Sequence, residues 1–195
     1  MKVYYSPDYV VDLGAHTFPT RKWKLVAEGL RAEAGVELLD PGLPPRQYLE
    51  LAHTKEWVAK VLGGALTLED ETRLELPWSK ALSQAHQAHV MGTLLACRDA
   101  LKCGLGLHAG GGAHHAFAGY GEGFCLLNDI AVALRVLRQE GHIERAAVVD
   151  LDVHQGNGTA AILSEEELGC FSIHQDDVYP FALTPGQRRL GEGAP

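Results

Sequence analysis

The sequence lacks any long apolar segment. A helix that crosses a bilayer needs about 20 apolar residues, and none of the apolar runs in this chain approaches that length. The first residues, Met1 to Ser6, also lack the apolar stretch that directs a protein to secretion. We therefore expect a cytoplasmic protein with no membrane partner.

Positive charge is scarce as well. The 195-residue chain has 17 Lys and Arg against 25 Asp and Glu, which gives a formal net charge of −8. Nucleic-acid binding depends on clustered cations that contact phosphates, and the only short basic run is RKWK at residues 21–24. The composition argues against direct binding to nucleic acid and favours a cationic substrate.

Cysteine is rare and irregularly spaced. The four cysteines form no C-x-x-C pair and no regular framework, which argues against disulfides and against a thiolate metal site. We expect reduced side chains that take part in packing. These residues are Cys97, Cys103, Cys125 and Cys170.

The remaining composition is that of one globular domain covering residues 1–195, because 46% hydrophobic and 22% charged residues suffice for a sizeable core. Periodicity and turn signals divide it into alternating strands and helices. The predicted strands are 2–5, 36–39, 145–150 (fully buried) and 170–174. The predicted helices are 22–33, two pieces of 44–63 that separate near His53, 79–102, 124–140 and a short one ending at Leu163. We expect a loop at 69–71. In the glycine-rich segment 104–112 the backbone should bend sharply or let another group approach closely. This alternation predicts an α/β fold with an open parallel sheet.

Two polar motifs stand out. GGGAHHA carries adjacent histidines, and DLDVHQGNG, from Asp150 to Gly158, follows a predicted strand. Ligands of open parallel sheets bind beyond the carboxyl ends of the strands. Side chains two apart on an extended segment point the same way, so Asp150, Asp152 and His154 can face one site.

These residue types indicate hydrolytic chemistry. Carboxylate and imidazole suit zinc or another first-row dication, and two histidines beside the metal can divide the proton transfers. The alternative reading is a capping aspartate with a hydrogen-bonded core histidine. Buried adjacent imidazoles both need polar partners, so the pair His114 and His115 favours a catalytic site.

The order of these motifs resembles the histone deacetylase family, which includes bacterial acetoin-utilisation and acetylpolyamine amidohydrolase relatives. The resemblance rests on GGGAHHA, GFCLLNDIA at 123–131, DLDVHQGNGT at 150–159 and FSIH at 171–174, with weaker similarity at 5–7 and 16–22. The QGN variant resembles the class IV-like branch. The family implies a three-layer α/β fold of the arginase/deacetylase type, here apparently an N-terminal portion and incomplete at the C-terminal side.

The resemblance also implies roles for the polar residues. Asp152 and His154 would be zinc ligands, and His114 and His115 the catalytic pair. Asp150 would hydrogen-bond His114 and stabilise its cationic form. Asn157 would orient His115 without favouring its charged form, leaving it free to act as a general base.

Substrate and cation sites follow from the same resemblance. Gly123 and Phe124, with Tyr179, would clasp the apolar stem of an acetyl-lysine-like group or acetylated amine. A potassium ion would bind Asp150 together with main-chain oxygens. Those oxygens belong to Asp152, His154, Ser172 and Ile173.

One required group is missing from the motifs. A catalytic zinc takes three protein ligands, and the family's third aspartate and its later tyrosine have no matching block here. The later acidic residues that could substitute are 165–167, Asp176, Asp177 and Glu192. The chain is either an N-terminal fragment, whose open sheet edge would favour association with other chains, or a short relative that binds without turnover.

Three functions remain open at this point. The first is a zinc-dependent amidohydrolase of acetyl-lysine or acetylated small amines. The second is a dimanganese ureohydrolase, which would need an acidic residue where Gly156 stands. The third is a non-catalytic acyl-lysine or polyamine binding module. The composition fits a bacterial source, and the sequence leaves the physiological substrate open.

Overall fold

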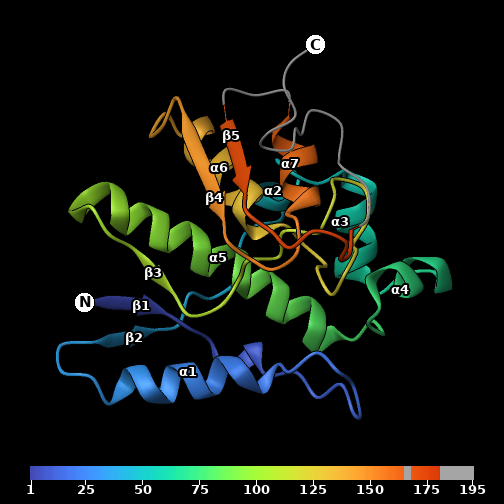
Figure 1. Cartoon of the computed structure of the whole chain (residues 1–195), viewed down its shortest axis with the longest axis horizontal. Coiled ribbons are helices and arrows are strands. Elements are labelled where there is room, and N and C mark those ends of the chain that lie inside the picture. Colours follow the sequence, from blue (N-terminus) through green and yellow to red (C-terminus); the bar gives the residue numbers. More distant parts are fainter. Residues whose placement is uncertain (165–167, 181–195) are drawn as a thin grey trace.

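The computed structural model describes residues 1–164 and 168–180. In this part of the chain, short strands alternate with helices (Figure 1). The strands are β1 (Lys2–Tyr4), β2 (Glu37–Leu39), β3 (Leu107–His108), β4 (Ala146–Asp150) and β5 (Leu168–Ser172). The helices are η1 (Pro7–Tyr9, a 3-10 turn), α1 (Arg21–Arg31), α2 (Arg46–Leu49), α3 (Lys55–Gly63), α4 (Leu68–Leu74), α5 (Lys80–Cys103), α6 (Asp129–Gln139) and α7 (Asn157–Leu163). Within this part, no helix has both the length and the apolar character needed to cross a membrane.

The strands pair in parallel, as the sequence predicts, but they form two sheets. One sheet has the order β2-β1-β3, and the other pairs β4 with β5. The α/β class is therefore confirmed. The continuous sheet that we expected is divided within the described residues, because β3 and β4 do not pair with each other.

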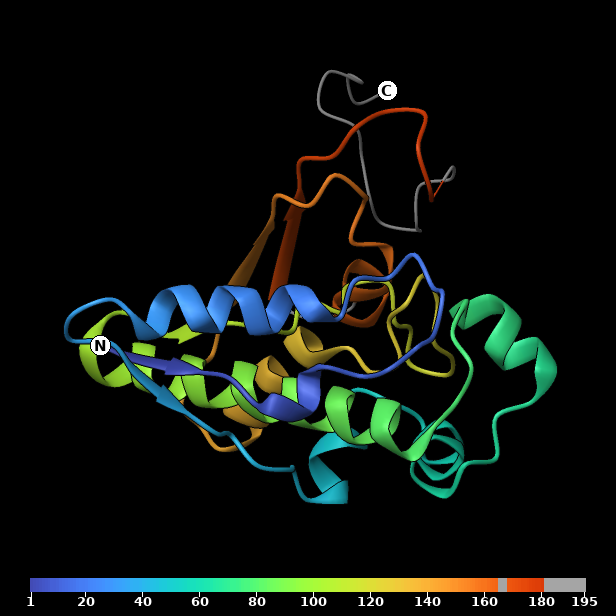
Figure 2. The same ribbon diagram turned by 90° about the horizontal axis from the view of Figure 1, so that it is seen from below.

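Helices cover both faces of the first sheet, which gives it three layers (Figure 2). Successive strand residues point to opposite faces. Tyr4 donates a hydrogen bond of 2.8 Å to Asp99 of α5, whereas Tyr5 belongs to an apolar cluster with Ala27 of α1. Helices α5 and α1 therefore lie on opposite sides of β1.

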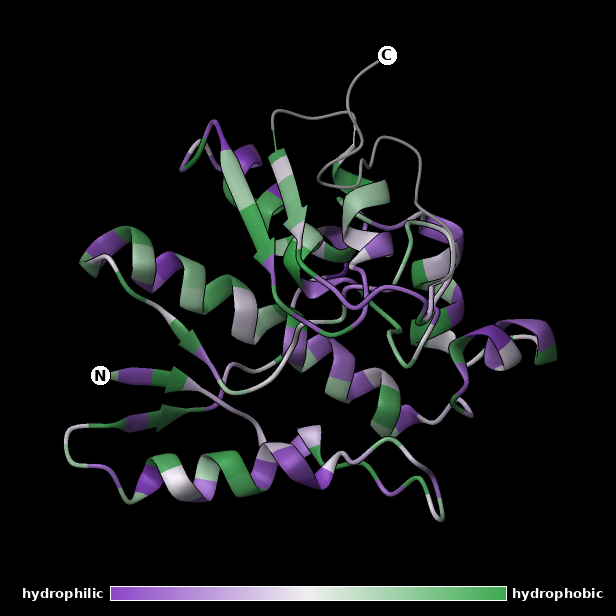
Figure 3. Ribbon diagram, viewed as in Figure 1, coloured by the Kyte–Doolittle hydropathy of each residue, from purple (hydrophilic) through white to green (hydrophobic). Residues whose placement is uncertain are grey.

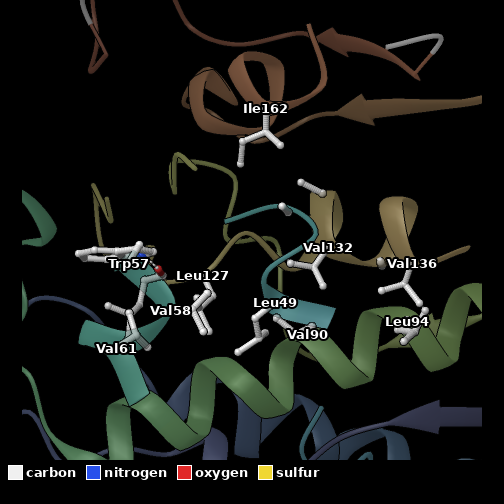
Figure 4. Close-up of a cluster of buried hydrophobic side chains, with 14 of the residues drawn as sticks. Leu49, Trp57, Val58, Val61, Val90, Leu94, Leu127, Val132, Val136 and Ile162 are labelled. Carbon is white, nitrogen blue, oxygen red and sulfur yellow. Dashed lines mark hydrogen bonds between the residues drawn. The ribbon is translucent and has the colours of Figure 1, made fainter. Parts of the chain in front are cut away.

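The larger core lies where α5 packs against α6 and α3. Figure 4 shows Val90 and Leu94 of α5 directed toward Val132 and Val136 of α6. Trp57 of α3 is 1% exposed, and its indole N–H donates to the Leu126 carbonyl oxygen at 3.0 Å. The long helix predicted at 79–102 is confirmed as α5 and forms the floor of this core.

Two predictions about elements are wrong. Residues 69–71, expected to be a loop, lie in α4, which Thr67 and Asp70 begin with a reciprocal capping box. The helix expected from Phe124 starts only at Asp129, because Asn128 accepts the Ala131 N–H and caps it. The glycine-rich segment contains strand β3 and allows the close approach that was expected, because a Cβ on Gly106 would lie 1.7 Å from the Ala96 carbonyl oxygen.

Strand β4 is also less buried than predicted. Figure 3 shows hydrophobic residues along both β4 and β5. Val149 is nevertheless 63% exposed, and Phe171 of β5 is 42% exposed. The apolar run in β4 therefore predicted a strand buried on both faces, whereas one face of β4 is exposed. Strand β5 begins at Leu168, two residues before the predicted start at Cys170.

Asp129 fixes the glycine-rich segment to the start of α6. Its side chain is fully buried and accepts the backbone N–H groups of Gly112 at 3.1 Å and Ala113 at 2.7 Å. The hydroxyl of Thr93 donates to the same carboxylate. The first turn of a helix favours negative charge, so this carboxylate is stabilised where it lies. It therefore holds the backbone directly before His114.

Several buried histidines are neutral. His53 donates from Nδ1 to the Phe117 carbonyl oxygen at 3.0 Å and accepts the Asn128 N–H on Nε2 at 2.9 Å. A second ring proton would break the latter bond. Burial lowers the pKa of His53 to about 4, and burial likewise lowers the pKa of His86 and His108 to about 4.

We expect the free energy of unfolding to fall as the pH drops from about 6.5 to about 4. In this window the unfolded chain protonates histidines near their ordinary pKa of about 6.5, while His53, His86 and His108 stay neutral in the folded state. Acid therefore favours the unfolded state. Urea unfolding at several pH values measures the slope of the free energy of unfolding against pH. His53→Gln should reduce that slope by the contribution of about one proton. A free energy that does not change with pH in this window would contradict the prediction.

The substitution Asp129→Asn should destabilise the protein by about 2 to 4 kcal/mol, because an amide nitrogen would replace a charged acceptor of backbone N–H groups. Urea unfolding measures this loss. The exposed ion pair of Glu50 with Arg46 supplies the control, and Glu50→Gln should cost less than about 1 kcal/mol. Equal losses in the two variants would show that Asp129 does not hold the loop.

Candidate active site

The polar motif after β4 folds into turns. The N–H of Asp152 donates to Oδ1 of Asp150 at 3.0 Å, and the N–H of His154 donates to Oδ1 of Asp152 at 2.8 Å. We expected these residues to lie along an extended segment, and that expectation is wrong, because β4 ends at Asp150. Aspartate turns, and not strand alternation, gather the three side chains beyond the carboxyl end of β4.

His114 pairs with Asp150. Its Nδ1 lies 2.6 Å from Oδ2 of Asp150, and the side chains are only 8% and 10% exposed. Burial raises the pKa of Asp150, but the hydrogen bond and charge of His114 outweigh burial and hold this pKa below its ordinary value. The two side chains thus form a close, buried hydrogen-bonded pair.

His115 has a different partner. Its Nδ1 lies 2.7 Å from the amide oxygen of Asn157, which in turn donates from Nδ2 to Glu122 at 3.0 Å. An amide oxygen only accepts, so Nδ1 carries the ring proton and Nε2 has a free lone pair. Burial and the neighbouring His114 lower the pKa of His115 to about 4. This ring is therefore neutral near pH 7 and able to take a proton.

The start of α7 packs directly on the tandem histidines. The N–H of Thr159 donates to the His114 carbonyl oxygen at 2.9 Å. A Cβ on Gly158 would lie 2.4 Å from the Ala116 carbonyl oxygen, so only glycine fits at this position. The motif thus brings Asn157 to His115 through a close backbone approach.

Asp152 and His154, the expected metal ligands, lie close together. Oδ1 of Asp152 lies 3.2 Å from Nδ1 of His154, and the two side chains are 51% and 43% exposed. The same oxygen is 3.9 Å from Nε2 of His114. Carboxylate and imidazole suit zinc, so the pair fits two of its coordination positions.

A third donor does not appear in the part of the chain that is described. No group of three or more His, Cys, Asp or Glu side chains there is arranged to hold a metal ion. Asp176 and Asp177 do not complete the set. The predicted substitutes 165–167 and Glu192 lie outside the described residues.

A cavity of about 430 Å³ opens at these residues. Gly123, Phe124 and Tyr179 all line it, together with both tandem histidines. Phe124 stacks on Phe18 with ring centroids 5.1 Å apart, and the Tyr179 ring lies 5.0 Å from that of His115. The residues expected to clasp a substrate stem are thus brought to one cavity.

Tyr179 is fixed by Glu122, a residue that the sequence analysis did not single out. The Tyr179 hydroxyl donates to Oε1 of Glu122. Burial, followed by this hydrogen bond, raises the pKa of Tyr179, so the phenol stays protonated. Glu122 thus connects Tyr179 to Asn157, and no motif spacing marks it.

The expected cation-site residues also come together. Ser172 is the register partner of Asp150 in the β4-β5 sheet, and the N–H of Ile173 donates to the Asp150 carbonyl oxygen at 2.9 Å. All four cysteines are free thiols. Cys125 is buried and lines the cavity, whereas Cys103 is exposed, so the expected packing role is wrong for Cys103.

Comparison with known proteins gives this arrangement a context. An uncharacterized protein of Picosynechococcus sp. is 43% identical over 91% of this chain and 61% of its own length. The acetoin utilization protein AcuC of Bacillus subtilis is 30% identical over 97% of this chain and 53% of its own length. The chain therefore spans a little over half the length of these relatives.

Solved structures show the same fold. A histone deacetylase homolog from Aquifex aeolicus superposes with a TM-score of 0.75 at 21% identity, over 92% of this chain and 53% of that one. A homolog complexed with SAHA gives a TM-score of 0.74 with the same coverage and identity. The model of the histone deacetylase domain matches residues 16–194. With nearly its whole length matched, the chain belongs to the histone deacetylase family.

Proposed function

We propose that this chain forms part of a zinc-dependent amidohydrolase that removes acetyl groups from acetyl-lysine or from acetylated small amines. One observation carries the proposal: two adjacent histidines with different partners lie beside a carboxylate and an imidazole of the kind that hold zinc. Membership of the histone deacetylase family supports it.

Asp152 and His154 would hold the metal, together with a third donor that the proposal requires. Zinc in that position would supply a Lewis acid for the amide oxygen. Both side chains are about half exposed, so they are accessible to an ion. The end of β4, beside Ser172 and Ile173, is the proposed place for potassium.

The two histidines divide the proton transfers. Neutral His115 takes a proton at Nε2 from the attacking water, because Asn157 keeps the other ring nitrogen protonated. His114, which is hydrogen-bonded at Nδ1 to Asp150, supplies a proton for the departing amine. The different partners thus make one ring a base and the other an acid.

The cavity walls favour a long, thin side chain. Phe124 and Tyr179 bury methylene groups and exclude water from the reacting centre. The formal charge of −8 favours amines that carry positive charge elsewhere. We therefore favour acetylated lysine side chains or polyamines as substrates.

A binding module without turnover remains the second candidate, because in the described part of the chain only Asp152 and His154 lie at the proposed metal position. Such a protein would use the same cavity to hold an acylated amine. The two functions predict different results for metal content and acetate release.

Purified protein should contain zinc and release acetate from an acetyl-lysine peptide, and a chelator should abolish the release. Loss of a residue that only hydrogen-bonds a metal ligand lowers metal affinity roughly 10- to 100-fold. Asp152→Asn replaces a proposed ligand itself, so it should lower zinc affinity by a larger factor. Zinc content by mass spectrometry and acetate release are the measurements, with the exposed Asp8→Asn as control. Tight peptide binding with neither zinc nor acetate would favour the binding module.

His115→Ala should reduce turnover by about 10²- to 10⁴-fold, because the general base is lost, while zinc content stays unchanged. The exposed His142→Ala provides the matched control and should retain turnover. Steady-state kinetics with zinc-saturated protein measures the effect. Near-full turnover of His115→Ala would show that another group takes the proton.

A further inference from the structure

Glu122 holds two residues of the site but has no step of its own in the proposed chemistry. Its side chain is partly buried, and its backbone is fixed in a tight turn. The Glu122 N–H donates to the Cys125 carbonyl oxygen at 3.1 Å, and the Cys125 N–H donates back to the Glu122 carbonyl oxygen at 2.9 Å. The same turn is attached to the end of α4, because the Phe124 N–H donates to the Leu74 carbonyl oxygen at 2.9 Å. Glu122 therefore projects from a rigid support.

Two donors converge on one oxygen of Glu122. Its Oε1 accepts the hydroxyl of Tyr179 and, at 3.0 Å, the amide nitrogen Nδ2 of Asn157. An ionised carboxylate only accepts hydrogen bonds, so it satisfies both donors at once. Asn157 is thereby required to turn the NH₂ end of its amide toward Glu122.

The orientation of the Asn157 amide is therefore determined by its partners. The two ends of an asparagine side chain have nearly the same shape and differ in what they donate and accept. Oδ1 of Asn157 lies 2.7 Å from Nδ1 of His115 and accepts the Gly158 N–H at 2.9 Å. The reversed amide would direct its oxygen at the Glu122 carboxylate and its NH₂ group at the Gly158 N–H. Glu122 and the Gly158 backbone thus hold the amide in one orientation.

This orientation decides which nitrogen of His115 carries the proton. The hydrogen bond at one ring nitrogen of a histidine selects the tautomer. Opposite an amide oxygen, Nδ1 of His115 donates and Nε2 keeps a lone pair. Opposite an amide NH₂ group, Nδ1 would accept, and the proton would reside on Nε2. The ring is neutral in both forms, so the difference lies in the position of the proton and not in the charge.

We propose that Glu122 is the positioning residue that selects the base tautomer of His115, acting through the Asn157 amide. This inference rests on the proposed function, in which His115 takes a proton at Nε2. It makes the acceptor character of residue 122 essential, in addition to its size. A glutamine would fill nearly the same space, but it both donates and accepts, so it would not fix the direction of the hydrogen bonds.

Glu122→Gln should lower kcat about tenfold or more in zinc-loaded protein acting on an acetyl-lysine peptide, with the larger effect on kcat and the smaller on KM. The loss expected for a catalytic histidine held in the wrong tautomer reaches about 10⁴-fold. Glu140→Gln is the matched control, because Glu140 accepts the Tyr48 hydroxyl at 3.2 Å and Arg98 at 2.6 Å. It should retain turnover. A Glu122→Gln protein with the kcat of the unmodified enzyme would overturn the proposal.

A second substitution separates this role from a loss of packing. Asn157→Asp in the Glu122→Gln protein supplies a group that only accepts, from His115 on one side and from the new glutamine amide on the other. The kcat should therefore rise above that of Glu122→Gln alone. In the unmodified protein, Asn157→Asp would direct a second carboxylate at Glu122 and should lower kcat. A further loss in the double variant would show that Glu122 does not act through the direction of these hydrogen bonds.

The tautomer itself can be observed without turnover. In metal-free, ¹⁵N-labelled protein at about pH 8, well above the ordinary imidazole pKa, protonated and unprotonated ring nitrogens have well-separated ¹⁵N signals. Those of His115, one of ten histidines, are identified by their loss in His115→Gln. Nδ1 should carry the proton in the unmodified protein and in Glu140→Gln, whereas Glu122→Gln should also show the form protonated on Nε2.

The two kinds of measurement distinguish the possible failures. The same His115 tautomer in Glu122→Gln as in the unmodified protein overturns the role of Glu122, even where kcat falls, and leaves the proposed function standing. If the unmodified protein releases no acetate, the proposed function fails. The ¹⁵N signals then decide by themselves whether Glu122 selects the tautomer.

Discussion

The buried carboxylate of Asp129 is the contact on which the arrangement of the site depends. It accepts the backbone N–H groups of Gly112 and Ala113, and so fixes the chain immediately before the tandem histidines. Because Asp129 is also the first residue of α6, the segment that carries the tandem histidines is attached to the helix that packs on the larger core. The position of His114 and His115 thus follows from the same packing that stabilises the fold.

Two chemically different histidines result from one short segment. Their rings lie 4.1 Å apart at the centroids, yet one faces a carboxylate and the other an amide. Burial and its neighbours lower the pKa of His115, so the ring that faces the amide is neutral. The other ring faces Asp150, whose pKa is held below its ordinary value. Glu122 supports this difference by holding both Asn157 and Tyr179.

Periodicity and turn residues predicted much of the fold. The order of the motifs predicted that residues of GGGAHHA and DLDVHQGNG lie near one another. The 24-residue helix α5 and the break between α2 and α3 follow from periodicity, and the paired motifs converge on one cavity. Side-chain caps and packing against distant segments caused the errors: Thr67 with Asp70 made a helix where acidic residues indicated a loop. The place of His86 and His89 on the cavity wall could not be predicted, because they have ordinary helical spacing and line the cavity only where α5 meets Trp23 of α1.

The close approach of α7 to the histidine segment has a consequence for sequence variation. With the Ala116 carbonyl oxygen 2.4 Å from where a Cβ would be, position 158 tolerates no side chain unless two backbones separate. Random mutagenesis followed by selection for folded protein should therefore recover almost solely synonymous codons at Gly158, while exposed neighbours such as Ser164 accept many amino acids. A glycine with no chemistry of its own thus becomes one of the least replaceable residues of the molecule.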